Sequence, residues 1–184
     1  MERITIPRDL IVEAESYAKI SRSFTSDRHD FHEGGLDAKQ RKMFEGKLGE
    51  KLVKHLLIIS GVVFQEDKSS HTQADLFDFI FPNGKTMDVK TRTKNFHTRT
   101  LEMKEQLSKA PKDIYVSVRL FPATYEGFVI GWASKKDFLR VNRIENNGFL
   151  DNYVLFDHEL RTWERLIEFL EIPKEDSMTW PNTP

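Results

Sequence analysis

LFDFIFPNGKTMDVKTR, residues 76–92, places two runs of strand-forming residues on either side of the turn FPNG. Proline fixes φ at the second position of a type I turn, and Gly84 can adopt the left-handed conformation that closes a three-residue hairpin loop. Residues 76–81 and 85–91 are therefore predicted to form a β-hairpin. With this loop, Asp78 lies opposite Asp88.

The two faces of this hairpin differ in character, because side chains alternate along a strand. One face is apolar, and the other brings together Asp78, Asp88 and Lys90. Directly opposed residues have Cβ atoms about 5 Å apart, so the two carboxylates repel each other unless a cation lies between them. Hard oxygen ligands favour Mg²⁺. Lys90 could orient or deprotonate a water or hold a phosphate, although a solvated, charged hairpin face would also explain the pattern.

Asp75 is an alternative to Asp78 as the first acid. A bulge or a change of register before the hairpin would turn Asp75 toward Asp88. With the preferred loop, however, Asp75 shares the core face with Phe77, so Asp78 is the favoured candidate.

The remaining hydrophobic pattern predicts a single α/β domain with a central mixed sheet flanked by helices. Residues 39–172 form the predicted core domain, residues 1–38 an N-terminal helical extension and loop, and residues 173–184 a mobile tail. Helices are predicted at 7–20, 39–59, 97–109, 135–141 and 159–170, and further strands at 62–66, 113–120, 127–133 and 152–156.

The long helix at 39–59 carries two candidate acids. Glu50 lies at the margin of the apolar face, where a carboxylate can reach a site at the edge of the sheet. Glu45 projects from the same helix and is the alternative. Gly46 and Gly49 would let this helix approach the sheet closely. A surface ion pair with Lys54 would also explain Glu50.

These residues resemble the PD-(D/E)XK nuclease superfamily, which has the restriction-endonuclease-like fold. The resemblance covers residues 39–120: a helix bearing Glu50, then Asp78 or Asp75, the hairpin, and Asp88-Val89-Lys90. Ala74, or Phe77 if Asp78 is the acid, stands in place of the family's Pro, and Asp88 stands where many members have Glu.

The resemblance implies a Mg²⁺-dependent DNA endonuclease of restriction or phage and mobile-element type, with Mn²⁺ able to substitute. The predicted metal ligands are Asp78, Asp88 and the carbonyl of Val89, which would hold Mg²⁺, and Glu50, which would bind a second ion directly or through water. Lys90 would help to activate the attacking water, and the metal would stabilise charge on the scissile phosphate. One site cuts one strand, so a homodimer is expected for duplex cleavage.

The region after the hairpin is rich in positive charge. Residues 85–112 hold eight Lys and Arg side chains against three acids, which indicates a phosphate-binding surface. The predicted DNA contacts are Thr91, Arg92, Lys94 and Arg99.

The composition excludes several other classes of protein. Lys and Arg total 28 and Asp and Glu total 29, so the net charge of −1 disfavours a dedicated non-specific nucleic-acid binder. The absence of Cys excludes disulfides and thiolate metal sites and suits the cytoplasm. The sequence contains no signal peptide, no membrane-spanning apolar run and no phosphate-binding glycine motif, so neither a membrane nor a nucleotide cofactor is expected.

Two other functions remain open from the sequence. A Holliday-junction-resolvase-like enzyme would have the same site and prefer four-way junctions to linear duplex. A catalytically silent DNA-binding or protein-binding module on the same scaffold would bind Mg²⁺ weakly and would not respond to Asp88→Asn.

Overall fold

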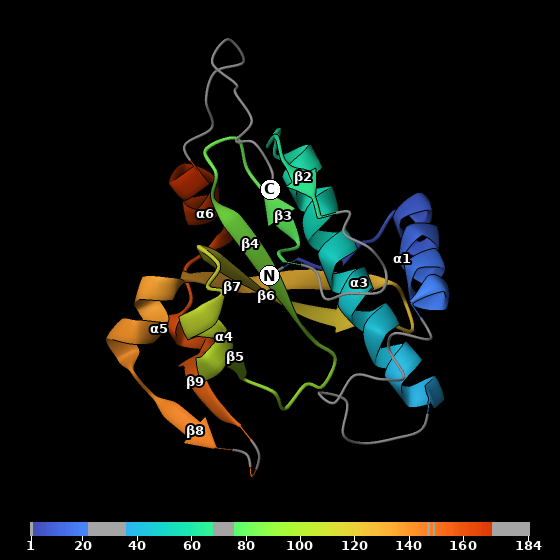
Figure 1. The fold of residues 1–184 in the computed structure, drawn as a ribbon. Helices are drawn as coiled ribbons and strands as arrows, with labels where there is room; N and C mark the ends of the chain where they lie inside the picture. The colour runs from blue at the N-terminus through green and yellow to red at the C-terminus, as the bar shows by residue number, and fades with distance from the viewer. Residues whose placement is uncertain (1, 22–35, 68–75, 147, 149, 171–184) are drawn as a thin grey trace.

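The computed structural model describes residues 2–21, 36–67, 76–146, 148 and 150–170. Along the chain, its elements are β1 (Ile4–Thr5), α1 (Arg8–Ile20), α3 (Leu36–Ile59), β2 (Gln65–Glu66), β3 (Phe79–Ile80), β4 (Thr86–Arg92), β5 (Arg99–Met103), α4 (Lys104–Lys109), β6 (Ile114–Phe121), β7 (Glu126–Ser134), α5 (Lys135–Val141), β8 (Ile144–Asn146), β9 (Asp151–Phe156), the 3-10 helix η1 (Asp157–Glu159) and α6 (Trp163–Leu170). A six-stranded sheet has the order β1-β7-β6-β4-β3-β2, and a three-stranded sheet has the order β5-β9-β8 (Figure 1). The predicted α/β fold with a mixed sheet and flanking helices is confirmed at this level.

The β3–β4 hairpin has the register predicted from its turn. Phe79 pairs with Met87, and the amide of Phe81 donates to the carbonyl of Lys85 over 3.0 Å. Gly84 closes the loop with a φ of +78° and donates its amide to Phe81 O over 2.8 Å. A side chain at this φ would be strained, which explains the glycine.

Strand β6 contributes side chains to two hydrophobic cores, one on each of its faces. It runs parallel to β4 and antiparallel to β7. Val116 and its alternate neighbours join the larger core, which includes apolar side chains of α1, α3 and α6. Tyr115 joins a smaller core with Leu107 of α4, Phe138 of α5 and Leu155 of β9. The alternation of β6 therefore separates the α3 side of the sheet from the side covered by β5 and β9.

Helix α3 spans 24 residues along the sheet and ends as predicted near Gly61, where the Val62 amide donates to Leu57 O over 3.0 Å. Leu48 and Leu52 belong to the larger core. Of the helices in the described part of the chain, α3 included, none is long and apolar enough to cross a membrane.

The N-terminal residues belong to the same core as the rest of the chain. Strand β1 pairs with β7 at the edge of the large sheet, with Ile4 opposite Gly127. Helix α1 packs beside α3 and buries Leu10, Ile11 and Ala14 in the larger core (Figure 1). The predicted boundary between residues 38 and 39 falls inside α3. The predicted tail, 173–184, lies outside the described residues.

The helix predicted at 97–109 is wrong in its first half. Residues Arg99–Met103 form β5, and a helix follows only at Lys104–Lys109. Strand β5 pairs with β9 over its whole length, from Arg99 opposite Phe156 to Met103 opposite Asn152. This partner lies about fifty residues away in the sequence, so tertiary pairing overrides the local helical pattern.

Candidate functional site

The candidate site lies beside β4 at the start of β3. Within the described residues, β3 pairs only with Thr86 and Met87 of β4. Among those residues, the rest of β4 therefore has a strand neighbour on one edge only, which is β6. Asp78 precedes β3 and occupies this transition. Its amide donates to Met87 O over 2.9 Å, and its Oδ2 accepts a 2.6 Å hydrogen bond from the Val89 amide. The register thus places Asp78 next to Asp88, as predicted.

Asp78 is surrounded by negative charge. Burial of its carboxyl raises the pKa of Asp78, and the charges of Glu50 and Asp88 raise it further. The positive charge of Lys47 and the hydrogen bond from Val89 lower the pKa without cancelling this rise. Glu50 from α3 and Asp88 from β4 therefore both lie close enough to Asp78 to repel its carboxylate. A bound cation would relieve that repulsion.

Lys90 connects two carboxylates on the side of β4 that faces β5. Its Nζ lies 2.8 Å from Asp88 Oδ2 and 2.6 Å from Glu102 Oε2. Burial alone would lower the pKa of Lys90, but the charges of the two carboxylates outweigh burial and raise it. Lys90 is therefore a cation at neutral pH, which suits the binding of an anion and does not suit the removal of a proton.

Glu102 is the site residue that sequence reasoning misses. Its side chain is 4% exposed and reaches Lys90 from β5. A 2.6 Å hydrogen bond between Thr100 Oγ1 and Ser117 Oγ joins β5 to β6 beneath it. Burial raises the pKa of Glu102, and the opposing charge of Lys90 does not cancel this rise. The buried residues of β5, Thr100 and Glu102, are both polar, so hydrophobic periodicity in the sequence gives no signal of their burial.

Helix α3 brings Glu50 to the site because Gly49 allows the helix to contact β4. A Cβ atom on Gly49 would lie 2.0 Å from Thr91 Oγ1. The Glu50 side chain is 16% exposed, bonds Lys47 over 2.8 Å and acts electrostatically on Asp78. This coupling favours Glu50 over Glu45 as the helix acid.

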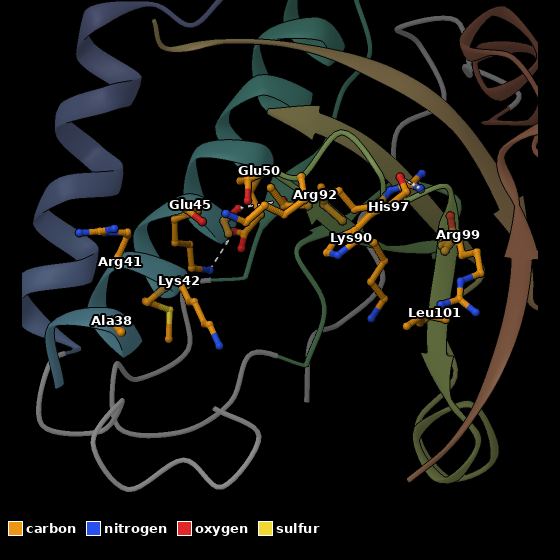
Figure 2. A pocket seen from close by; sticks show the side chains of 18 of the residues that line it. Ala38, Arg41, Lys42, Glu45, Glu50, Lys90, Arg92, His97, Arg99 and Leu101 are labelled. Carbon is orange, nitrogen blue, oxygen red and sulfur yellow. Dashed lines mark hydrogen bonds and ion pairs between the residues drawn. The ribbon is translucent and has the colours of Figure 1, made fainter. Parts of the chain in front are cut away.

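A cavity of about 1060 Å³ opens between α3 and the β4–β5 segment. Figure 2 shows Arg41, Lys42 and Glu50 on the α3 wall, with Lys90 and Arg99 across from them. Two acids, Glu45 and Glu50, and seven basic side chains line it: Arg41, Lys42, Lys47, Lys90, Arg92, Lys94 and Arg99. Asp78 and Asp88 adjoin this lining through Val89 and Lys90. The carboxylate cluster therefore borders a predominantly basic cavity.

The four predicted DNA contacts have different environments. Lys94 is exposed in the loop after β4, and Thr91 packs against Gly49. Arg99 is exposed and forms an ion pair with Glu145. Arg92 is 7% exposed, bonds Asp157 over 2.7 Å and donates to a loop carbonyl, so its bonds are structural.

The donor chemistry of the cluster suits a hard divalent cation. Carboxylate and carbonyl oxygens are the ligands that Mg²⁺ and Mn²⁺ prefer. Across the ranges that the structure describes, however, no three His, Asp or Glu side chains form a ready-made metal group. Glu50 is instead bonded to Lys47, and Asp88 to Lys90. A metal ion would have to displace these ammonium groups from the carboxylates.

Glu50, Asp78, Asp88 and Lys90 are thus brought together from α3, the start of β3 and β4. The alternative acid, Asp75, lies outside the described residues. No family model, curated protein or solved structure matches this chain.

Proposed function

We propose that this protein is a Mg²⁺-dependent DNA endonuclease of the PD-(D/E)XK type, with a restriction-endonuclease-like core. One observation carries the proposal: the carboxyl of Asp78 lies against the negative charges of Glu50 and Asp88 at the border of a basic cavity. Repelling carboxylates are costly to the fold. Retaining them beside an anion-attracting cavity is consistent with a site that binds both a cation and a phosphate.

The cation would be held by oxygen atoms of Glu50, Asp78 and Asp88 and by the carbonyl of Val89. Mn²⁺ would substitute for Mg²⁺, since both take oxygen ligands. When bound, the metal supplies positive charge at the scissile phosphate and a lowered pKa for the attacking water.

Lys90 would act as a fixed cation beside the reacting phosphate. Its raised pKa favours neutralising charge or orienting the water over accepting a proton. Glu102 bonds the Lys90 ammonium, which also contacts Asp88, and is a positioning residue. Exposed cations on the cavity wall, Lys42 and Lys94 among them, would bind the flanking phosphates.

The test is DNA cleavage with Mg²⁺, Mn²⁺ or EDTA, on supercoiled plasmid, linear duplex and circular single-stranded DNA. Wild type is compared with Asp88→Asn and Lys90→Ala. The control is Glu105→Gln, because Glu105 is an exposed carboxylate of α4 that pairs with Lys109. We expect cleavage with either metal and none with EDTA, a loss of about 100-fold or more in the two site variants, and an unchanged control. Cleavage that survives EDTA or Asp88→Asn, or no cleavage of any DNA, would contradict the proposal.

A further inference from the structure

The cavity beside the carboxylates has an apolar component as well as a basic one. Met43, Phe96 and Leu101 line it together with the basic side chains. Pockets for single drug-sized ligands span about 300–1,000 Å³, so a cavity of about 1060 Å³ is large enough for an extended ligand. Phosphates alone would not require this apolar lining, which suits bases or other flat apolar groups.

Phe96 is the most exposed large apolar side chain of the described residues, at 76%. It lies in the loop 93–98, between β4 and β5, and its ring makes a T-shaped contact with His97 at 4.6 Å between centroids. Slight burial and neighbouring cations, Arg119 and Arg92 first among them, lower the pKa of His97. An exposed aromatic ring therefore lies in a region of positive potential.

The loop that carries Phe96 is held in place by two buried arginines. Arg92 and Arg119 are each 7% exposed. Both donate to His97 O, over 3.0 Å and 2.6 Å, and Arg119 also donates to Lys94 O. Arg92 is fixed in turn by its ion pair with Asp157. The backbone on either side of Phe96 is thus held before a ligand binds, which reduces the entropy lost on binding.

Base stacking on an aromatic side chain requires an accessible base face. In a duplex, both faces of an internal base are covered by neighbouring base pairs, whereas an unpaired strand exposes its bases. Proteins that bind single strands combine a basic groove for the backbone with aromatic side chains for the bases. Phe96 beside Lys94, at the edge of a basic cavity, has these two components.

We infer that the cavity binds an unpaired segment of DNA, with one base stacked on Phe96 and the adjoining phosphates bound by Lys94 and the α3 cations Arg41 and Lys42. The inference rests on the proposed function, because it names the form of DNA that reaches the carboxylates. One strand needs one active site, so this substrate does not require a dimer.

The test is fluorescence anisotropy in EDTA, where no cleavage occurs, with labelled 12-residue oligothymidine and a 12-base-pair duplex. Wild type should bind the single strand at least tenfold more tightly than the duplex. Phe96→Ala should weaken single-strand binding about five- to 150-fold, and Phe96→Trp should retain it. Ile59→Ala removes a side chain that is 62% exposed at the end of α3, away from the cavity lining, and should change nothing.

Equal or tighter binding of the duplex would overturn the inference, and so would an unchanged single-strand affinity in Phe96→Ala. Tight binding to oligouridine but not to oligothymidine would also overturn it. The proposed function is judged separately by metal-dependent cleavage. If duplex DNA is cleaved and Phe96→Ala does not change single-strand binding, the nuclease proposal stands and the single-strand site is refuted. If single-strand binding depends on Phe96 but no DNA is cleaved, the nuclease proposal is refuted and the binding site is supported.

Discussion

Lys90 Nζ lies 2.6 Å from Glu102 Oε2, so a carboxylate from the small sheet holds a lysine of the candidate site. The same ammonium lies 2.8 Å from Asp88 Oδ2. Lys90 is therefore shared between a predicted metal ligand and a residue of β5. The position of the small sheet therefore affects how strongly Lys90 pairs with Asp88.

Glu102→Gln should increase the Mg²⁺ concentration needed for half-maximal cleavage. Without the charge of Glu102, the Lys90 ammonium pairs with Asp88 alone and competes more strongly with a metal ion for that carboxylate. Substitution of a residue that orients a metal site reduces metal affinity or activity about 10- to 100-fold. Cleavage rates measured over a Mg²⁺ titration test this, with Glu105→Gln as the matched control. An unchanged Mg²⁺ requirement would assign Glu102 to stability alone.

Gly49→Ala should destabilise the protein. The new Cβ would lie 2.0 Å from Thr91 Oγ1, so α3 must move away from β4. Overpacking of this kind costs about 1–3 kcal/mol, and each kcal/mol corresponds to roughly 2–4 °C of Tm in a chain of this size. The displacement also moves Glu50, so cleavage should fall with stability. Thermal unfolding and cleavage rate measure the two effects.

Gly46→Ala is the control for this change. Gly46 lies one turn earlier in α3, and a Cβ atom added there would meet no neighbouring atom within 4 Å. Replacing glycine by alanine inside a helix contributes about 0.5–1 kcal/mol, so Tm should rise. Thr91→Ala should partly rescue Gly49→Ala, because it removes the overlapping oxygen. Equal Tm values for the two glycine variants would contradict the close contact between α3 and β4.

Asp78→Asn should stabilise the metal-free protein at neutral pH while abolishing cleavage. The pKa of Asp78 is higher in the folded protein than its ordinary value of 3.8, so the folded state binds the proton more tightly. Ionisation therefore destabilises the fold as pH rises above about 3.8, and this penalty is absent at lower pH. Asn avoids the penalty and can still accept the hydrogen bond from Val89. Mutations that remove charge strain from a functional site commonly trade activity for stability.

Thermal unfolding in EDTA at several pH values tests this prediction. Tm should rise by a few degrees at pH 7, and the difference from wild type should shrink as pH falls toward 4. Asp151→Asn is the control, since Asp151 is half exposed on β9. A lower Tm for Asp78→Asn at pH 7 would show that the carboxylate stabilises the metal-free fold.

Lys94→Ala should reduce the salt dependence of DNA binding. Each phosphate contact on a single strand contributes about 0.7 to the slope of log K against log salt concentration. Loss of one contact should lower the slope by about that amount. Lys109→Ala removes an exposed cation of α4 outside the cavity lining and should leave the slope unchanged. Identical slopes for Lys94→Ala and wild type would exclude Lys94 as a phosphate contact.

Local chemistry was sufficient to predict the hairpin and its two acids. The FPNG turn determines the loop length, loop length determines register, and register places Asp78 beside Asp88. The position of Glu50 at the margin of an amphipathic helix was similarly predictable. Whether these residues form a nuclease site stays a prediction.

Glu102 and the loop that carries Phe96 depend on contacts between distant parts of the chain. The spacing of Glu102, Glu105 and Lys109 is typical of a solvated helix with local ion pairs. Of these residues, only Glu105 and Lys109 form such a pair. Glu102 is buried because β5 pairs with β9 and approaches Lys90. In the sequence, Arg119 is one charge within a strand, and its role at the loop carbonyls follows from the parallel pairing of β4 with β6.

The most direct test of the central claim is Mn²⁺ binding, measured by electron paramagnetic resonance of free Mn²⁺ in a titration of wild type, Asp88→Asn and Glu105→Gln. We predict that wild type and Glu105→Gln bind Mn²⁺ alike and that Mg²⁺ displaces it. Asp88→Asn should lose at least about tenfold in affinity. No Mn²⁺ binding by wild type, or equal binding by Asp88→Asn, would contradict a metal site at Glu50, Asp78 and Asp88.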